Sequence, residues 1–162
     1  MNNKEVARNS DDSFVTIEGG KNELTQKMIR EAIGGFEKKL LEAKEEDKVA
    51  LKTFHDFAEG VYIRTVHMKA GTLITGKIHR IEHAVIVAQG KASVLSEEFG
   101  AKEISAPMVF ISPAEAKRLF FIREDMIWTT VHPNPTNTRD LDELEKALIL
   151  EDYEQITEGE MK

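Results

Sequence analysis

The spacing of apolar residues changes along the chain, and each change predicts a different kind of element. Between residues 23 and 43, apolar side chains recur every three or four positions, which is typical of an amphipathic helix. Gly34 and Gly35 interrupt this pattern. Each lowers helix stability by about 1 kcal/mol relative to Ala, so the helix could kink, approach another backbone closely or simply tolerate both residues. Residues 50–58 are predicted to form a second helix or an irregular lead-in.

Between residues 61 and 132 the pattern favours β-strands. Short runs rich in β-branched and aromatic residues are separated by glycine and proline. The runs are VYIRTVHM, TLITGKI, HAVIVA, ASVL, KEIS, MVFI, KRLFFI and MIWTTVH. No helical pattern between them is long enough to connect parallel strands. The fold class is therefore mainly β, as an antiparallel barrel or a double-sheet jelly roll.

A turn-rich linker, PNPTNT, follows the last of these runs. Thr138 is then expected to cap a helix over about residues 139–150, whose leucines form one apolar stripe. We expect a single domain with four parts: a disordered tail (1–20), a helical N-terminal flank (21–58), a barrel (59–133), and a linker with the C-terminal helix and a tail (134–162).

Composition narrows the class of protein. A length of 162 residues fits one domain, and the 41% hydrophobic and 31% charged fractions are those of a globular protein. We expect neither a membrane span nor a secretory signal, and hence a cytoplasmic location. A net charge of −7 argues against nucleic acid as a partner. Because the chain has no cysteine, only His, Asp and Glu remain as metal ligands.

The candidate chemistry centres on GTLITGKIHRIEHAVIVAQG, residues 71–90. Side chains alternate along an extended strand, so Lys77 and His79 would share one face. A turn through residues 80–82 would return His83 to the same interior. Two converging imidazoles can hold Zn²⁺, Fe²⁺, Mn²⁺ or Ni²⁺ when a third ligand arrives.

His132 is the best candidate for the third ligand. Alternation places Trp128, Thr130 and His132 on one face of their strand, so an aromatic wall and a hydroxyl would accompany the imidazole. The alternative is that His79 and His83 are hydrogen-bonded structural residues in a metal-free pocket.

The same residues allow a different class of site. HRIEH, residues 79–83, is an H-x-x-E-H sequence, the signature of zinc peptidases in which a helix presents both histidines and the glutamate serves as base. The β-branched residues that follow favour strands over a helix.

Basic residues suggest an anion-binding cavity. Arg64 alternates with Tyr62 and Val66, and it could line the barrel interior together with Lys77 and Arg118. Their donors would suit a carboxylate, a sugar phosphate or a nucleotide, whereas the alternative places these side chains at the solvent edge. His55 and His67 have no spacing partner, so we expect them to be structural or exposed.

The spacing of residues 71–90 resembles the first motif of the cupin superfamily. Gly71 and Gly90 stand at the two glycine positions, Lys77 and His79 stand at the two histidine positions, and His83 stands where a glutamate is usual. In SPAEAKRLF, Pro113 fits the proline of the second motif, Glu115 replaces its glycine, and Arg118 falls near its histidine. The resemblance implies a cupin-type antiparallel double-stranded β-helix.

The blocks GVYIRTV, TGKIHRIEH, SPAEAKRLFF and EDMIWTTVHP also resemble small cupin-like proteins of tailed bacteriophages and prophages that have no assigned activity. This resemblance covers roughly residues 55–150 and implies a viral protein in the cytoplasm of an infected host cell.

The sequence thus predicts a homodimeric cupin that binds a divalent metal, a small polar or anionic ligand, or both. As an enzyme it would carry out metal-assisted isomerisation or oxygen chemistry on a small acidic metabolite. The competing class is a non-catalytic protein that captures a small host molecule or serves in phage assembly.

Overall fold

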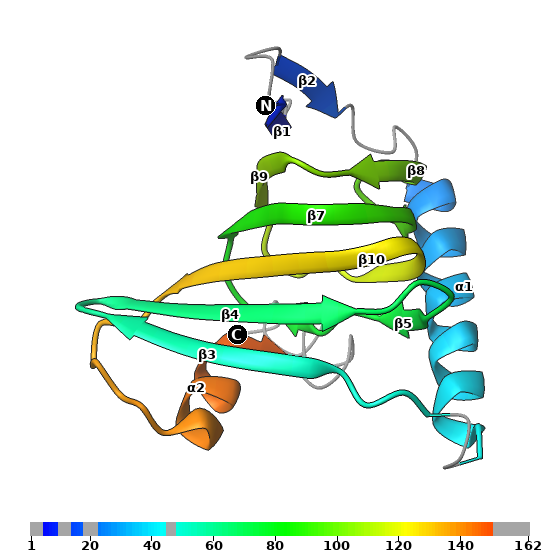
Figure 1. The fold of residues 1–162 in the computed structure, drawn as a ribbon. Coiled ribbons are helices and arrows are strands. Elements are labelled where there is room, and N and C mark those ends of the chain that lie inside the picture. Colours follow the sequence, from blue (N-terminus) through cyan, green and yellow to red (C-terminus); the bar gives the residue numbers. More distant parts are fainter. Residues whose placement is uncertain (1–4, 10–13, 18–22, 45–47, 151–162) are drawn as a thin grey trace.

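One antiparallel sheet makes up most of the fold (Figure 1). The computed structural model describes residues 5–9, 14–17, 23–44 and 48–150. The strands are β1 (Glu5–Asn9), β2 (Phe14–Ile17), β3 (Lys52–Ala58), β4 (Val61–Met68), β5 (Leu73–Thr75), β6 (Ile78–His79), β7 (His83–Ser96), β8 (Gly100–Ser105), β9 (Met108–Ser112), β10 (Arg118–Pro133) and β11 (Ile149–Leu150). The helices are α1 (Glu23–Glu42) and α2 (Leu141–Leu148). The predicted class, mainly β with an N-terminal and a short C-terminal helix, is confirmed.

The long strands β7 and β10 hold the sheet together. Their pairing places them side by side at the centre of the order β2-β1-β9-β7-β10-β4-β3. At one end β7 also pairs with β9, and β10 with β4; at the other end β7 pairs with β8, and β10 with β5. Each strand therefore belongs to two halves of the sheet, and both halves bury side chains in one core.

A bend where the register of β7 and β10 slips lets these strands pass from one half to the other. Gly90 lies at this point with a φ of 89°, and an added Cβ would stand 2.4 Å from the carbonyl oxygen of Asp125. Only glycine fits both the left-handed backbone and this close approach. Beyond the bend, the buried residues of β10 alternate through Met126, Trp128, Thr130 and His132, as the sequence predicts.

Helix α1 runs beside one end of the barrel, at the right in Figure 1. Ile33 is fully buried, and ion pairs join Glu37 to Lys117 and Arg30 to Glu97. A methyl group at either glycine of the helix, Gly34 or Gly35, would meet no atom of the described residues within 4 Å. The two glycines are therefore tolerated, and the possibility of a close backbone approach is wrong.

Helix α2 and β11 close the other side. Asp140, rather than Thr138, caps the helix, because its carboxylate accepts from the backbone N–H groups of Asp142 and Glu143. Leu144 and Leu148 pack against Tyr62, which gives the predicted apolar stripe its partner. The last two predicted helical residues, 149 and 150, instead form β11 and pair with β6.

Several local predictions are corrected. Residues 52–58 form β3 rather than a helix or an irregular segment, because pairing with β4 satisfies their backbone groups. Within the predicted disordered tail 1–20, residues 5–9 and 14–17 form β1 and β2, and β1 pairs with β9. Two pairs of predicted strands are continuous: HAVIVA with ASVL in β7, and KRLFFI with MIWTTVH in β10. The rest of the tail, and residues 151–162, lie outside the described residues.

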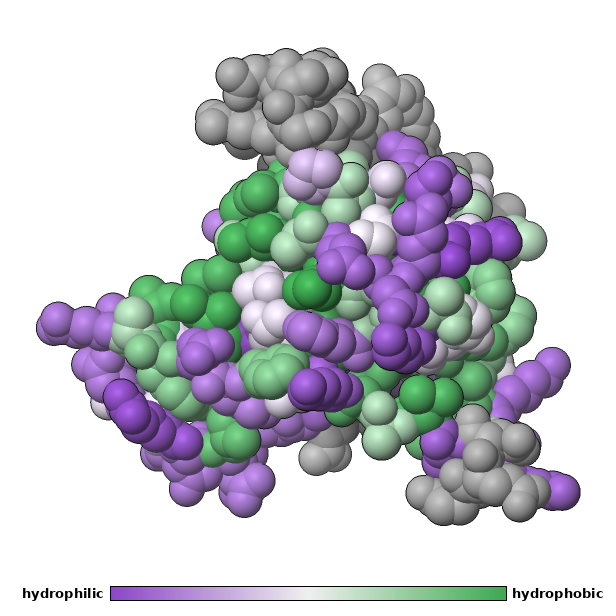
Figure 2. Space-filling view, viewed as in Figure 1, coloured by the Kyte–Doolittle hydropathy of each residue, from purple (hydrophilic) through white to green (hydrophobic). Residues whose placement is uncertain are grey.

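The outer face of β7 and β9 exposes apolar side chains. Ile86, Val109 and Ile111 are 37%, 46% and 47% exposed, and Figure 2 shows hydrophobic surface where these strands lie. The homodimer expected from the sequence stays a prediction. Among the described residues, no helix combines the length and apolar character needed to cross a bilayer.

We expect Gly90→Ala to lower the free energy of unfolding by about 3 kcal/mol or more, because it adds a steric clash to left-handed strain. Gly100→Ala is the matched control: its φ is 73°, but nothing lies within 4 Å of the added methyl, so the loss should be about 1–2 kcal/mol. Urea unfolding measures both. Equal losses would show that the contact with Asp125 is unimportant.

Candidate functional site

Three histidines from separate parts of the chain meet inside the barrel. His79 ends β6, His83 begins β7, and His132 lies near the end of β10. Their potential ligand atoms all lie within 4.8 Å of one another, and their ring centroids are 4.2 to 4.9 Å apart. His83 and His132 are only 5% and 2% exposed. The structure thus brings together the three residues that the sequence proposed as ligands.

Backbone hydrogen bonds set the position of each ring. His79 pairs with Ile149 across β6 and β11, and its carbonyl accepts from the N–H of Glu115 at 2.7 Å. A three-residue bend, 80–82, then leads into β7, where His83 begins the pairing with β9. His132 is fixed by its place opposite Tyr62 in the β10–β4 pair. Five strands (β4, β6, β7, β9 and β10) and the C-terminal β11 therefore determine the geometry.

Because His79 and His83 lie in strands joined by a bend, the zinc-peptidase interpretation of HRIEH is wrong. That site needs one helix to carry both histidines, whereas backbone pairing with β11 and β9 holds these residues in extended conformation.

Burial keeps the three imidazoles neutral. It is the main cause that lowers the pKa of His79 to about 2, of His132 to about 3 and of His83 to about 4. The positive charges of neighbouring groups add to this effect, among them Arg64 for His79 and His132. At neutral pH each ring keeps a lone pair, which is the form that binds metal.

The hydrogen bonds of the cluster also suit a metal. Nδ1 of His83 lies 3.2 Å from the carbonyl oxygen of Ile81, so Nδ1–H donates there and Nε2 keeps its lone pair. Nδ1 of His132 is buried and has no hydrogen-bond partner among the residues that the structure describes. Three neutral nitrogen donors are a set that Zn²⁺ and other divalent transition metals accept. The residues present therefore fit a metal.

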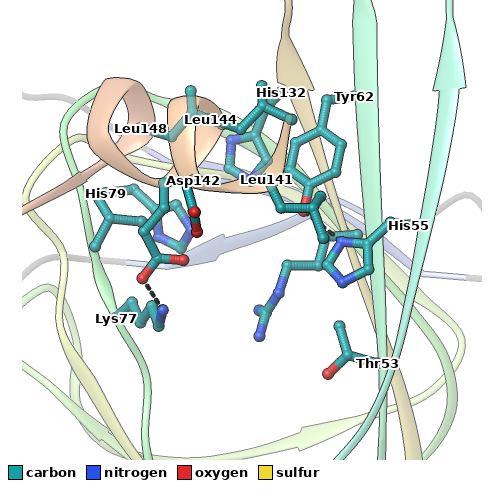
Figure 3. Close-up of a pocket in the computed structure, with 13 residues that line it drawn as sticks. Thr53, His55, Tyr62, Lys77, His79, His132, Leu141, Asp142, Leu144 and Leu148 are labelled. Atoms are coloured by element: carbon teal, nitrogen blue, oxygen red, sulfur yellow. Dashed lines mark hydrogen bonds and ion pairs between the residues drawn. The ribbon is translucent and has the colours of Figure 1, made fainter. Parts of the chain in front are cut away.

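Two cavities meet at this cluster. The first, of ≈ 270 Å³, lies between the barrel and α2 and is lined by Tyr62, His55 and His132 among others (Figure 3). The second, of ≈ 190 Å³, lies in the barrel and is lined by Trp128, Phe120 and His83 among others. Arg64, Lys77 and His79 line both cavities. The histidine cluster thus stands on the boundary between them.

All of the residues predicted for the site line at least one cavity, but their charges are not equally available. Lys77 forms an ion pair with Glu145 of α2 (Figure 3). Arg118 is 6% exposed; its guanidinium binds both carboxylate oxygens of Glu98 at 2.7 and 2.6 Å and donates to Ser112 at 2.9 Å. No ligand contact tests the roles proposed for Arg118, Trp128 and Thr130, which stay predictions.

One polar pair at the site, and the contribution of α2, were not predicted from the sequence. Nδ1 of His55 lies 2.7 Å from the Tyr62 hydroxyl, and both side chains line the first cavity. Asp142 and Glu145 bring carboxylates to the same cavity. Alternation with Arg64 already placed Tyr62 on the inner face, which was a usable signal; His55 joins it only because β3 pairs with β4.

No family model matches the sequence, and no curated protein matches it. Solved structures with a similar fold include a cupin superfamily protein from Desulfitobacterium hafniense (11% identity, 56% of this chain and 83% of that chain, TM-score 0.44) and an RmlC-like cupin with a double-stranded β-helix fold from Methanocaldococcus jannaschii (15%, 58% and 90%, 0.43).

An oxalate decarboxylase–formate complex from Lactobacillus farciminis is also similar (18% identity, TM-score 0.46). The match covers 59% of this chain and 32% of the enzyme's chain. Similarities at these levels assign no residue and no activity to this protein.

The lowered pKa values predict how stability depends on pH. Below pH 6.5 the unfolded chain takes up protons on His79, His83 and His132, while the folded protein does not until the pH nears 4, so stability is full above pH 6.5 and falls as the pH drops. Between pH 7 and 5.5 we expect the metal-free protein to lose up to about 4 kcal/mol, roughly 1.3 from each ring.

Urea unfolding at the two pH values measures this loss. His83→Gln should reduce it by about a third, whereas His67→Gln, which alters an exposed ring, should leave it unchanged. A loss below about 1 kcal/mol in the unaltered protein would contradict buried, neutral imidazoles.

We expect Glu98→Gln to destabilise the protein by about 3–5 kcal/mol, because it leaves the buried guanidinium of Arg118 without a counter-charge. Adding Arg118→Met to this variant should restore part of the loss. The urea midpoints of the unaltered protein, the two single variants and the double variant complete a double-mutant cycle. Lys91→Gln, at a partly exposed pair 3.8 Å from Glu103, should change little. Strictly additive losses would show that the pair is not coupled.

Proposed function

We propose that this protein is a metal-binding barrel of the cupin type, in which His79, His83 and His132 hold one divalent ion at the boundary of two cavities and the ion and cavity together bind a small anionic molecule. The observation that carries the proposal is the cluster itself: two buried imidazoles and one half-buried imidazole, that of His79, remain neutral and have their potential ligand atoms within 4.8 Å of one another. Placing three unfilled nitrogen donors in a protein interior has a desolvation cost that metal binding would offset.

In this proposal, different residues of the protein have different roles. The three histidines hold the ion, and Arg64 faces both cavities with a positive charge. Trp128 and Phe120 pack edge-to-face at 5.1 Å and give the second cavity a wall that excludes water. When bound, the ion would act as a Lewis acid toward an oxygen of the ligand. Metal-assisted isomerisation or oxygen chemistry on a small acidic metabolite suits this arrangement.

A second candidate is a non-catalytic protein that captures a small molecule or serves in phage assembly. It is supported by the charge pairing of the cavity walls: Glu145 offsets Lys77, and Glu98 offsets Arg118. Within the described part of the chain, no carboxylate belongs to the histidine cluster. A binder needs no such group, whereas many acid–base mechanisms do.

The resemblance to small phage proteins supplies the setting of the proposal. The blocks TGKIHRIEH and EDMIWTTVHP, which carry that resemblance, also carry His79, His83 and His132. We therefore place the metal centre in a protein made in the cytoplasm of an infected bacterial cell.

Metal content tests the proposal directly. Protein purified without an affinity tag and dialysed after exposure to Zn²⁺ should retain about one zinc ion per chain, as measured by elemental mass spectrometry. His79→Ala, His83→Ala and His132→Ala should each weaken Zn²⁺ binding by at least about 100-fold, because each removes a ligand. His67→Ala is the matched control, since its ring is exposed and lies against Phe54, and it should bind normally. Folded protein that takes up no metal would refute the metal centre.

A further inference from the structure

Counting only partners among the described residues, Arg64 is the one cation of the two cavity walls whose charge has none. Lys77 and Arg118 each form an ion pair, with Glu145 and Glu98. For Arg64, no hydrogen bond or ion pair of the guanidinium is formed with any residue that the structure describes. Its strand alternates Tyr62, Arg64 and Val66 on the inner face, and Arg64 lines both cavities beside His79. An arginine in this position is available to a ligand.

Arg64 lies beside the histidine cluster. It lines both cavities together with His79, and His132 lines the first of them. A guanidinium presents several donors in one plane and matches the two oxygens of a carboxylate. An anionic group placed between Arg64 and a metal ion held by the three histidines would therefore meet positive charge on both sides.

Most of the remaining lining of the second cavity is apolar. Its hydrophobic part consists of Leu51, Val66, Met68, Ile74, Ala116, Phe120 and Trp128. The hydroxyls of Thr75 and Thr130 and the charges of Lys77 and Arg118 also line the cavity, but each already has a partner within the protein. The apolar side chains cannot hydrogen-bond a sugar or a second charged group, so burying such a group against them would weaken binding at least about tenfold. The volume of ≈ 190 Å³ is also below the roughly 300–1,000 Å³ of sites for drug-sized ligands. The ligand body must be small and apolar.

We infer that the second cavity binds a small carboxylate with an apolar body, such as a short aliphatic acid, with the carboxylate on Arg64 and the body against Trp128 and Phe120. This inference rests on the proposed function for the location of the site, and it adds the class of ligand. It disfavours sugars, nucleotides and dicarboxylates, because the apolar part of the wall offers them no donors or acceptors and the polar groups beside it already have protein partners. A phosphate monoester with the same body shares the anionic head and is separated from the carboxylate by experiment.

Trp128, the only tryptophan of the chain, gives a direct readout because it lies on the cavity wall. Full-length protein is titrated with pentanoate, and Trp128 fluorescence and calorimetry are followed in the Zn²⁺-loaded form and in excess chelator. Three matched probes are compared with pentanoate. Pentan-1-ol lacks the charge, pentyl phosphate carries a phosphate in place of the carboxylate, and succinate carries a second carboxylate in place of the apolar end. Pentanoate should bind at least about tenfold more tightly than each of them.

Variants test the assignment to Arg64. Arg64→Gln should weaken pentanoate binding at least about tenfold while leaving Zn²⁺ stoichiometry unchanged, since Arg64 is not a ligand in the proposed centre. Arg123→Gln is the control: this exposed arginine donates to Ser93 and lines neither cavity, so binding should not change. Unchanged binding in Arg64→Gln, or equal affinity for pentan-1-ol, would overturn the inference. Tighter binding of pentyl phosphate or succinate would overturn the carboxylate head or the apolar body.

The two proposals fail separately in this design. Stoichiometric Zn²⁺ without pentanoate binding in either form would reject the ligand class and leave the metal centre standing. Pentanoate binding that depends on Arg64 in protein that takes up no metal would support the ligand class and reject the metal centre.

Discussion

The antiparallel pairing of β7 with β10 is the constraint on which the rest of the structure depends. These two strands carry His83 and His132, which pair with neighbouring strands on either side and point into the same interior. The bend at Gly90 lets both strands continue into the second half of the sheet, so one core and one cavity wall are shared by both halves. If one of these strands slipped by one residue, its histidine would turn outward and leave the cluster.

The C-terminal segment completes the histidine cluster and the first cavity. β11 pairs with β6 and holds His79 against the other two rings, while α2 covers Tyr62 and closes the first cavity. The cluster therefore depends on contacts between residues far apart in the sequence. The environment of its three imidazoles disfavours charge, so the rings stay neutral. Neutral rings are compatible with a purely structural role and with metal binding.

Much of the site followed from alternation along extended segments. This periodicity placed Lys77 with His79, Arg64 with Tyr62, and His132 with Trp128, and each of these residues lines a cavity. It could not show which charges are available, because Glu98 and Glu145 come from a turn and from α2. The pairing of Lys77 and Arg118, which leaves Arg64 without a partner among the described residues, is a property of the folded chain.

The sequence by itself determined the local elements, the inward face of the long strands and the chemistry of the donors, because alternation and residue type are encoded locally. The conformation of the short segments depends on their tertiary contacts. Residues 52–58 and 149–150 become strands only because β4 and β6 offer backbone partners. The tertiary structure likewise decided the distances within the histidine cluster and the depth of its burial, since both depend on strand register and on packing between distant parts of the chain.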